Sequence, residues 1–162
     1  MSRRRNSISC RSLLLLAAVA PVLLAGCNRS AVYSHFEAVD AAGWSRYDTL
    51  HFAVVAPADG SYSLRLDLRT NSLYPYTQLV LSSSLKAPHG GGWQTVSSVV
   101  DIVDNGGTPL GRGISIYQHA VLLPRQQLKE GDTLRINVAH AMARQQLPGI
   151  ADVGITASLE EE

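Results

Sequence analysis

Apolar and polar residues alternate with a period of two along most of the chain after residue 30. In the clearest run, residues 62–68, polar side chains separate Tyr62, Leu64, Leu66 and Leu68. Such alternation is typical of a β-strand with one buried face. Similar runs, with short connections and no long helical pattern, predict about eight strands at residues 31–39, 50–54, 62–68, 79–85, 95–103, 114–123, 134–138 and 153–159.

The connections between these runs carry recognisable turn signals. Pro57 presets its own backbone and Gly60 tolerates a positive φ, so residues 50–54 and 62–68 are predicted to form a hairpin. Residues 95–103 are rich in β-branched side chains and predict a buried strand. The pattern predicts an all-β fold, a single antiparallel β-sandwich that is jelly-roll-like, with a closed barrel as the alternative. It does not predict the strand order.

The first 26 residues have the composition of an export signal. Four arginines precede an uncharged run of 13 residues, Leu13 to Ala25, which is too short to span a bilayer comfortably. Small residues then precede Cys27, as in the lipobox of bacterial lipoproteins. We expect residues 1–26 to be a cleaved signal peptide, 27–30 a lipidated N-terminus and short tether, and 31–160 the β-sandwich domain.

Lipid attachment at Cys27 would account for the one cysteine that remains after cleavage, because Cys10 lies in the signal. Thiol catalysis and cysteine-based zinc sites are then excluded. Two or three acyl chains hold a protein firmly in a membrane, since each buried methylene contributes about 0.8 kcal/mol. In some outer-membrane lipoproteins, acidic residues after the cysteine resemble a surface-export signal. Asn28, Arg29 and Ser30 include none, so by this resemblance we expect the periplasmic face of the outer membrane.

The charge and the candidate side chains point away from several functions. After residue 26 the chain has ten basic and 13 acidic residues, and no basic patch with interleaved aromatic residues, so nucleic-acid binding is not expected. The five histidines show no metal-ligand spacing, and no serine has the context of a hydrolase nucleophile. The prediction is a non-enzymatic protein without a cofactor or a metal.

A polar stretch, residues 69–78, interrupts two predicted strands. It contains the turn formers Asn71 and Ser72, and Pro75 lies between Tyr74 and Tyr76. Exposed aromatic side chains can stack on sugars or hold a protein partner, whereas packed ones close the end of a sandwich. Both interpretations stay open for these tyrosines, and for Trp44 and Trp93.

The chain resembles the gliding-motility lipoprotein family GldH of the Bacteroidota. Three stretches carry the resemblance in the same order and spacing: residues 69–76, residues 110–113 followed by Tyr117, and the run Leu-Pro-Gly-Ile-Ala-Asp-Val-Gly-Ile at 147–155. The resemblance implies an outer-membrane lipoprotein without an assigned reaction. Such a protein acts with other envelope proteins in movement over surfaces or in the associated secretion pathway.

The three stretches lie in loops and bends, where binding residues concentrate. We therefore predict a partner surface that comprises Arg69, Asn71, Tyr74, Pro75, Tyr76, Arg112 and Asp152. A rival interpretation is that these segments are turns that specify the fold, with Gly149 and Gly154 required by the backbone. The alternative function is a carbohydrate-binding β-sandwich lipoprotein, which would need an exposed aromatic platform.

Overall fold

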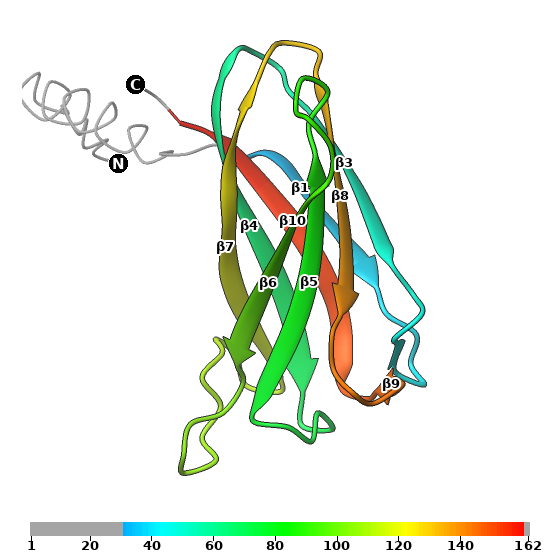
Figure 1. Cartoon of the computed structure of the whole chain (residues 1–162). Helices are drawn as coiled ribbons and strands as arrows, with labels where there is room; N and C mark the ends of the chain where they lie inside the picture. The colour runs from blue at the N-terminus through cyan, green and yellow to red at the C-terminus, as the bar shows by residue number, and fades with distance from the viewer. Residues whose placement is uncertain (1–30, 161–162) are drawn as a thin grey trace, which may run out of the picture. The chain divides into compact units, whose positions relative to one another are not determined.

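Ten antiparallel strands build the part of the chain that the computed structural model describes, residues 31–160. The predicted signal peptide, Cys27 and the tether lie outside these residues. The first sheet has the order β1 (Ala31–Ala38), β10 (Ile150–Leu159), β4 (Gly60–Asn71) and β7 (Ile116–Leu128). The second sheet has the order β3 (Leu50–Val55), β8 (Thr133–His140), β5 (Gln78–Lys86) and β6 (Gln94–Asp101). The short strands β2 (Trp44–Ser45) and β9 (Gln146–Leu147) form a separate ribbon (Figure 1).

The eight long strands pair as one long hairpin that has been rolled up. β1 pairs with β10, β3 with β8, β4 with β7, and β5 with β6, so the turn of the long hairpin lies between β5 and β6. Rolling adds two further pairings, β10 with β4 and β8 with β5. This is the jelly-roll arrangement, and it confirms the predicted antiparallel sandwich. The sheets remain separate, so the closed barrel is wrong.

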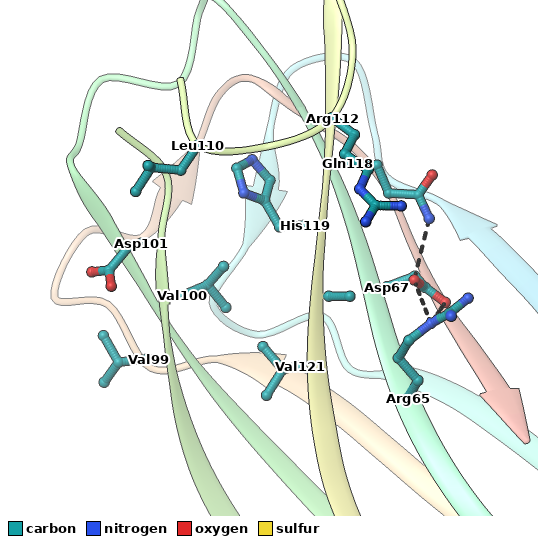
Figure 2. Close-up of a pocket in the computed structure, with 11 residues that line it drawn as sticks. Arg65, Asp67, Val99, Val100, Asp101, Leu110, Arg112, Gln118, His119 and Val121 are labelled. Atoms are coloured by element: carbon teal, nitrogen blue, oxygen red, sulfur yellow. Dashed lines mark hydrogen bonds and ion pairs between the residues drawn. The ribbon is translucent and has the colours of Figure 1, made fainter. Parts of the chain in front are cut away.

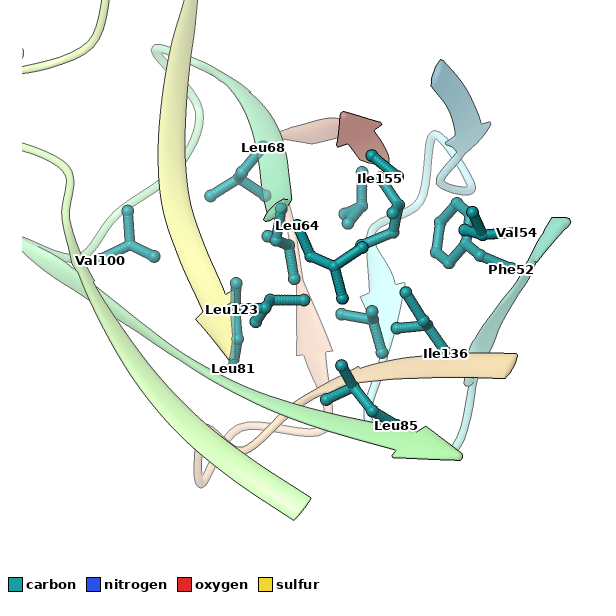
Figure 3. Packing of buried hydrophobic residues seen from close by; sticks show 14 of the residues in the cluster. Phe52, Val54, Leu64, Leu68, Leu81, Leu85, Val100, Leu123, Ile136 and Ile155 are labelled. Atoms are coloured by element: carbon teal, nitrogen blue, oxygen red, sulfur yellow. The ribbon is translucent and has the colours of Figure 1, made fainter. Parts of the chain in front are cut away.

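The core lies between the two sheets and is filled by the alternating side chains that the sequence pattern had marked. Figure 3 shows Leu64, Leu68 and Ile155 of the first sheet meeting Leu81, Leu85 and Ile136 of the second. All six side chains are at most 2% exposed. Truncating one such side chain to alanine costs about 2–5 kcal/mol, because a cavity remains in a close-packed interior.

The predicted hairpin of residues 50–54 and 62–68 is wrong, because its two strands belong to different sheets. After β3 the chain stays with β8: the N–H of Ala56 donates to the Asp132 carbonyl at 2.8 Å, and the N–H of Gly131 donates to the Ala56 carbonyl at 2.9 Å. β4 then starts at Gly60 in the first sheet. Turn residues permit a reversal of the chain but do not decide which sheet receives it.

The strand predicted at residues 95–103 exists as β6, but it is not buried. β6 is the last strand of the second sheet, and most of its residues are partly or fully exposed. β-Branched residues favour a pleated backbone in an edge strand as much as in a central one. Among the described residues, no helix is long and apolar enough to cross a membrane.

The two ends of the sandwich differ in what they carry. At one end β1 begins and β10 finishes, since Ala31 pairs with Ser158. At the other end lie the connections from β4 to β5, from β6 to β7 and from β9 to β10 (Figure 1). The stretches singled out in the sequence comprise parts of these three connections and the adjoining ends of β4, β7 and β10, so the fold brings them to the same end.

Candidate functional site

The β4–β5 connection is a well-ordered corner. The side-chain oxygen of Asn71 accepts from the N–H of Leu73 at 2.9 Å, and its carbonyl accepts from the N–H of Tyr74 at 3.1 Å. Tyr74 is 8% exposed, and its hydroxyl donates to the Gln78 carbonyl at 2.9 Å. Burial, followed by the neighbouring Tyr76, raises the pKa of Tyr74 well above the usual range of a tyrosine. Tyr74 is therefore a packed side chain of the corner.

Residues next to Tyr74 in the sequence form the solvent-exposed part of the corner. Leu73 is 69% exposed, Pro75 is exposed and Tyr76 is half-buried. The Tyr76 ring meets the Tyr74 ring edge-on, with 5.7 Å between the ring centroids, a favourable geometry for aromatic pairs. The corner thus presents an apolar tip on a rigid base.

The turn between β9 and β10 packs directly on this corner. The Gly149 carbonyl accepts from the N–H of Asn71 at 2.8 Å. Gly149 has a φ of +80°, and a Cβ atom there would lie 2.6 Å from the carbonyl carbon of Leu73. Both the backbone conformation and the close approach require glycine. The Leu147–Ile150 part of the sequence run is accordingly explained by backbone geometry.

Arg69 and Asp152 lie on the outer face of the first sheet, in a layered stack. Gly154 lies under the Phe36 ring, and a Cβ atom on this glycine would come within 2.6 Å of the ring. The Arg69 guanidinium lies over the same ring, 4.3 Å from its centroid, and donates to Asp152 at 3.2 Å. A cation over an aromatic face is attracted by the ring quadrupole. Arg69 and Asp152 therefore stabilise the sheet next to the corner, and Gly154 is required by the ring.

Arg112 lies in the connection between β6 and β7, and this segment reaches the corner through His119. Arg112 and Gln118 exchange two backbone hydrogen bonds of 2.9 Å. Below them a Cβ atom on Gly111 would lie 2.8 Å from the His119 ring, whose Nε2 is 3.1 Å from the Thr70 hydroxyl. Burial lowers the pKa of His119, and a hydrogen bond to the Asp101 backbone opposes this effect. Thr70 is 1% exposed and His119 is 7% exposed, so little of this hydroxyl–imidazole pair reaches solvent.

The sequence pattern placed Asp67 in a strand but indicated no role for it, and the structure shows it as the most deeply buried charge of the outer sheet face. Its carboxylate accepts from Arg65 Nε at 2.9 Å, from Thr156 Oγ1 at 2.9 Å and from Gln118 Nε2 at 3.2 Å, and it has no exposed surface (Figure 2). Arg65, Asp67 and Arg69 occupy alternate positions of β4, so they share one face. That Arg-x-Asp-x-Arg spacing was the available signal.

The four aromatic residues considered for sugar stacking do not form one platform. Trp93 is 47% exposed, but it lies beside Lys86, at the opposite end of β5 from Tyr76. Trp44 is 1% exposed, packs edge-on against His140 with centroids 5.4 Å apart, and donates from Nε1 to the Asp48 carbonyl at 3.1 Å. Tyr74 is buried as described above. Within residues 31–160 no three His, Asp or Glu side chains are grouped so as to hold a metal ion.

Comparison with known proteins finds relatives that match nearly the whole folded part of the chain. The GldH lipoprotein family matches residues 31–157. The gliding motility lipoprotein GldH of Flavobacterium johnsoniae is 26% identical over 151 residues, which cover 88% of this chain and 91% of the relative. A GldH homolog of Christiangramia forsetii is 25% identical over 145 residues, 82% of this chain and 86% of the relative.

Among solved structures, a family GH115 4-O-methyl-α-glucuronidase with specificity for decorated arabinogalactans matches 83% of this chain and 18% of its own, with a TM-score of 0.44 and 14% identity. That likeness is too low to bear on function. The family match instead spans nearly all of the folded part, including the corner, the bend at Arg112 and most of β10. The chain therefore belongs to the GldH lipoprotein family of gliding motility.

Proposed function

We propose that this protein is a non-enzymatic accessory component of the gliding-motility or associated secretion apparatus. In this proposal it is anchored through Cys27 at the periplasmic face of the outer membrane. It acts by holding another envelope protein at the corner surface, by which we mean the exposed parts of Leu73, Pro75 and Tyr76.

The observation that carries the proposal is the contrast between the tip and the base of the corner. Tyr74, Asn71 and Gly149 fix the backbone by hydrogen bonds and close packing, while the apolar Leu73 remains 69% exposed beside Pro75. An exposed apolar side chain on a rigid base loses little conformational entropy when a partner binds. More of the free energy gained by burying that side chain therefore contributes to affinity. Of the predicted residues, Tyr74 supports this surface from below, and Arg69 and Asp152 lie on the sheet beside it.

Site-specific photo-crosslinking in living cells tests the proposal. A photoreactive residue at Leu73 should give a discrete crosslinked product with an envelope protein. The same residue at Val55, which is also exposed but lies on β3, serves as the control. Equal products from both positions, or none from Leu73, would contradict a partner surface at the corner.

Alanine substitutions separate the contact from the packing. Tyr76→Ala should reduce the crosslink from Leu73 with little change in melting temperature. Tyr74→Ala should lower the melting temperature, because it leaves a cavity in a buried site.

Deleting the protein tests its role in cells. In cells that lack the protein, spreading on surfaces and protein secretion into the medium should fall. Wild-type levels of both would exclude a role in either apparatus.

A further inference from the structure

The edge of β7 that faces away from β4 has a short open stretch. Gln118 directs both of its backbone groups to this edge, where they bond Arg112. In an antiparallel ladder every second residue points its N–H and C=O to the same side. Ala120 and Leu122 therefore also point to the open edge, and they have no backbone partner there among residues 31–160. Pro124 follows and has no N–H to offer.

The outer edge of β6 lies across a groove from this stretch, and the His119 side chain reaches the backbone of Asp101 at one end of it. The Val80 carbonyl of β5 accepts from Ala141 on the side away from β6, so the same alternation turns the backbone groups of Val99 and Asp101 outward from the sheet. Residues 99–101 of β6 and 118–121 of β7 line a groove of about 650 Å³ (Figure 2). Leu110 and Arg112 lie at one end of it.

We propose that this groove receives an extended segment of a partner protein, which adds a strand to β7 at Ala120 and Leu122. Natural sheet edges are usually blocked along their length. Here Arg112 and Pro124 cover the two ends and leave the middle open. Strand addition takes its affinity from backbone hydrogen bonds and its specificity from alternate side chains. This surface is separate from the corner surface, and neither proposal requires the other.

The chemistry of the groove defines the segment. Val99 and Leu110 line the groove and are 57% and 55% exposed, and Leu122, which follows the lining residue Val121 on β7, is 78% exposed. The segment should therefore carry apolar side chains at alternate positions. Arg65, Arg69 and Arg125 each have a carboxylate partner. Arg112 has none among the described residues, so it would suit an acidic side chain.

The direction of the segment follows from the Arg112 bridge. The bridge is antiparallel to β7, and a strand that continues it past Leu122 and Ala120 would bring its C-terminal end to Arg112. The acidic residue therefore belongs near that end. A second copy of the chain suits the edge less well. If the β7 strands of two copies paired antiparallel with Val121 at the centre, Pro124 of one copy would lie opposite Gln118 of the other, where Arg112 is already bonded. Arg125 of the first copy would then lie next to Arg112 of the second, and the two positive charges would repel each other.

The test uses the mature lipidated protein in detergent micelles and a capped six-residue peptide of alternating valine and threonine that ends in aspartate. NMR of the protein should show shifts at the amides of Ala120 and Leu122, and slowed hydrogen exchange there. A peptide ending in lysine should bind about fivefold more weakly, as for an exposed charge pair. A peptide methylated on the backbone nitrogens that face β7 should lose binding by about tenfold or more, since it loses hydrogen bonds and clashes.

Two protein variants complete the test. Arg112→Glu should reverse the preference between the aspartate and lysine peptides. Ala120→Pro should abolish binding while leaving the fold intact, because the N–H of Ala120 points away from β4. The proposal is overturned if no amide of Ala120 or Leu122 shifts at about 1 mM peptide. It is also overturned if the methylated peptide binds equally, if Arg112→Glu changes nothing, or if Ala120→Pro instead dissolves a dimer of the protein.

Discussion

The close approach of Gly149 to the corner predicts an unusually costly glycine substitution. In Gly149→Ala the new Cβ atom would meet the backbone of Leu73 and Tyr74, which cannot move aside as a flexible side chain does. Gly131 gives a matched control: its φ is +82°, close to the +80° of Gly149, yet nothing lies within 4 Å of its Cβ position. The two substitutions share the conformational cost and differ in the steric one.

The magnitudes follow from these two contributions. A left-handed backbone costs a non-glycine residue about 1–2 kcal/mol, and alanine recovers part of this by restricting the unfolded chain. Gly131→Ala should therefore destabilise the domain by about 1 kcal/mol. Overpacking against a fixed backbone adds about 2 kcal/mol, so Gly149→Ala should cost about 3 kcal/mol. For a domain of this size the melting temperature should fall by about 4 °C and about 12 °C, respectively.

Urea unfolding of residues 28–162, followed by the fluorescence of the buried Trp44, would measure both losses. Gly91→Ala is a second control, because Gly91 has no atom near its Cβ position and no positive φ, and it should be almost neutral. If Gly149→Ala and Gly131→Ala agree within about 0.5 kcal/mol, the contact with the corner is not what selects glycine at position 149.

Three further predictions concern the anchor, the outer sheet face and a buried histidine. Cys27→Ser should abolish lipid labelling and release the protein from the membrane fraction; retention of either would refute lipidation. Asp67→Ala should lower the free energy of unfolding in urea by about 3 kcal/mol and Asp152→Ala by about 1 kcal/mol, since only the first removes a fully buried carboxylate that accepts from three side chains. Equal losses would show that burial of the carboxylate does not determine the cost of removing it. Burial lowers the pKa of His140 below its value of about 6.5 in the unfolded chain. As the pH falls below that value, the unfolded chain binds a proton at His140 and the native state does not, so the stability decreases. His140→Leu should weaken this dependence between pH 7.5 and pH 5, and an unchanged slope would contradict the assignment.

The fold could be predicted to the level of its architecture because alternation reports burial directly. Tyr62 to Leu68 marks the inner face of β4, and the same pattern locates most of the other long strands. Which strands become neighbours depends on contacts between distant residues, so the turn at Pro57–Gly60 could not be assigned to a hairpin or to a crossing between sheets. Residues 95–103 show the same limit, because composition favours a strand without placing it at the edge.

The sequence indicated where in the fold the candidate residues lie, but not which of them are packed and which are exposed. The three stretches do converge on one end of the sandwich, as their occurrence in loops suggested. Tyr74 could not be recognised as buried, because Tyr-Pro-Tyr fits an exposed or a packed corner equally well. The groove beside β7 left no sequence signal, since an open edge is defined by the strand that is missing.

The pairing of the first strands with the last ones also constrains the order in which the strands can pair during synthesis. β10 is the last of the ten described strands along the chain, yet it lies inside the first sheet, between β1 and β4. Only β5 and β6 among the long strands can pair soon after they are made, because every other pairing closes a longer loop. β1, the described strand nearest to the predicted lipid site Cys27, cannot pair before β10 has been made. A polypeptide delivered with its N-terminus first would therefore spend most of its delivery unfolded, and lipidation at Cys27 would precede formation of the sandwich.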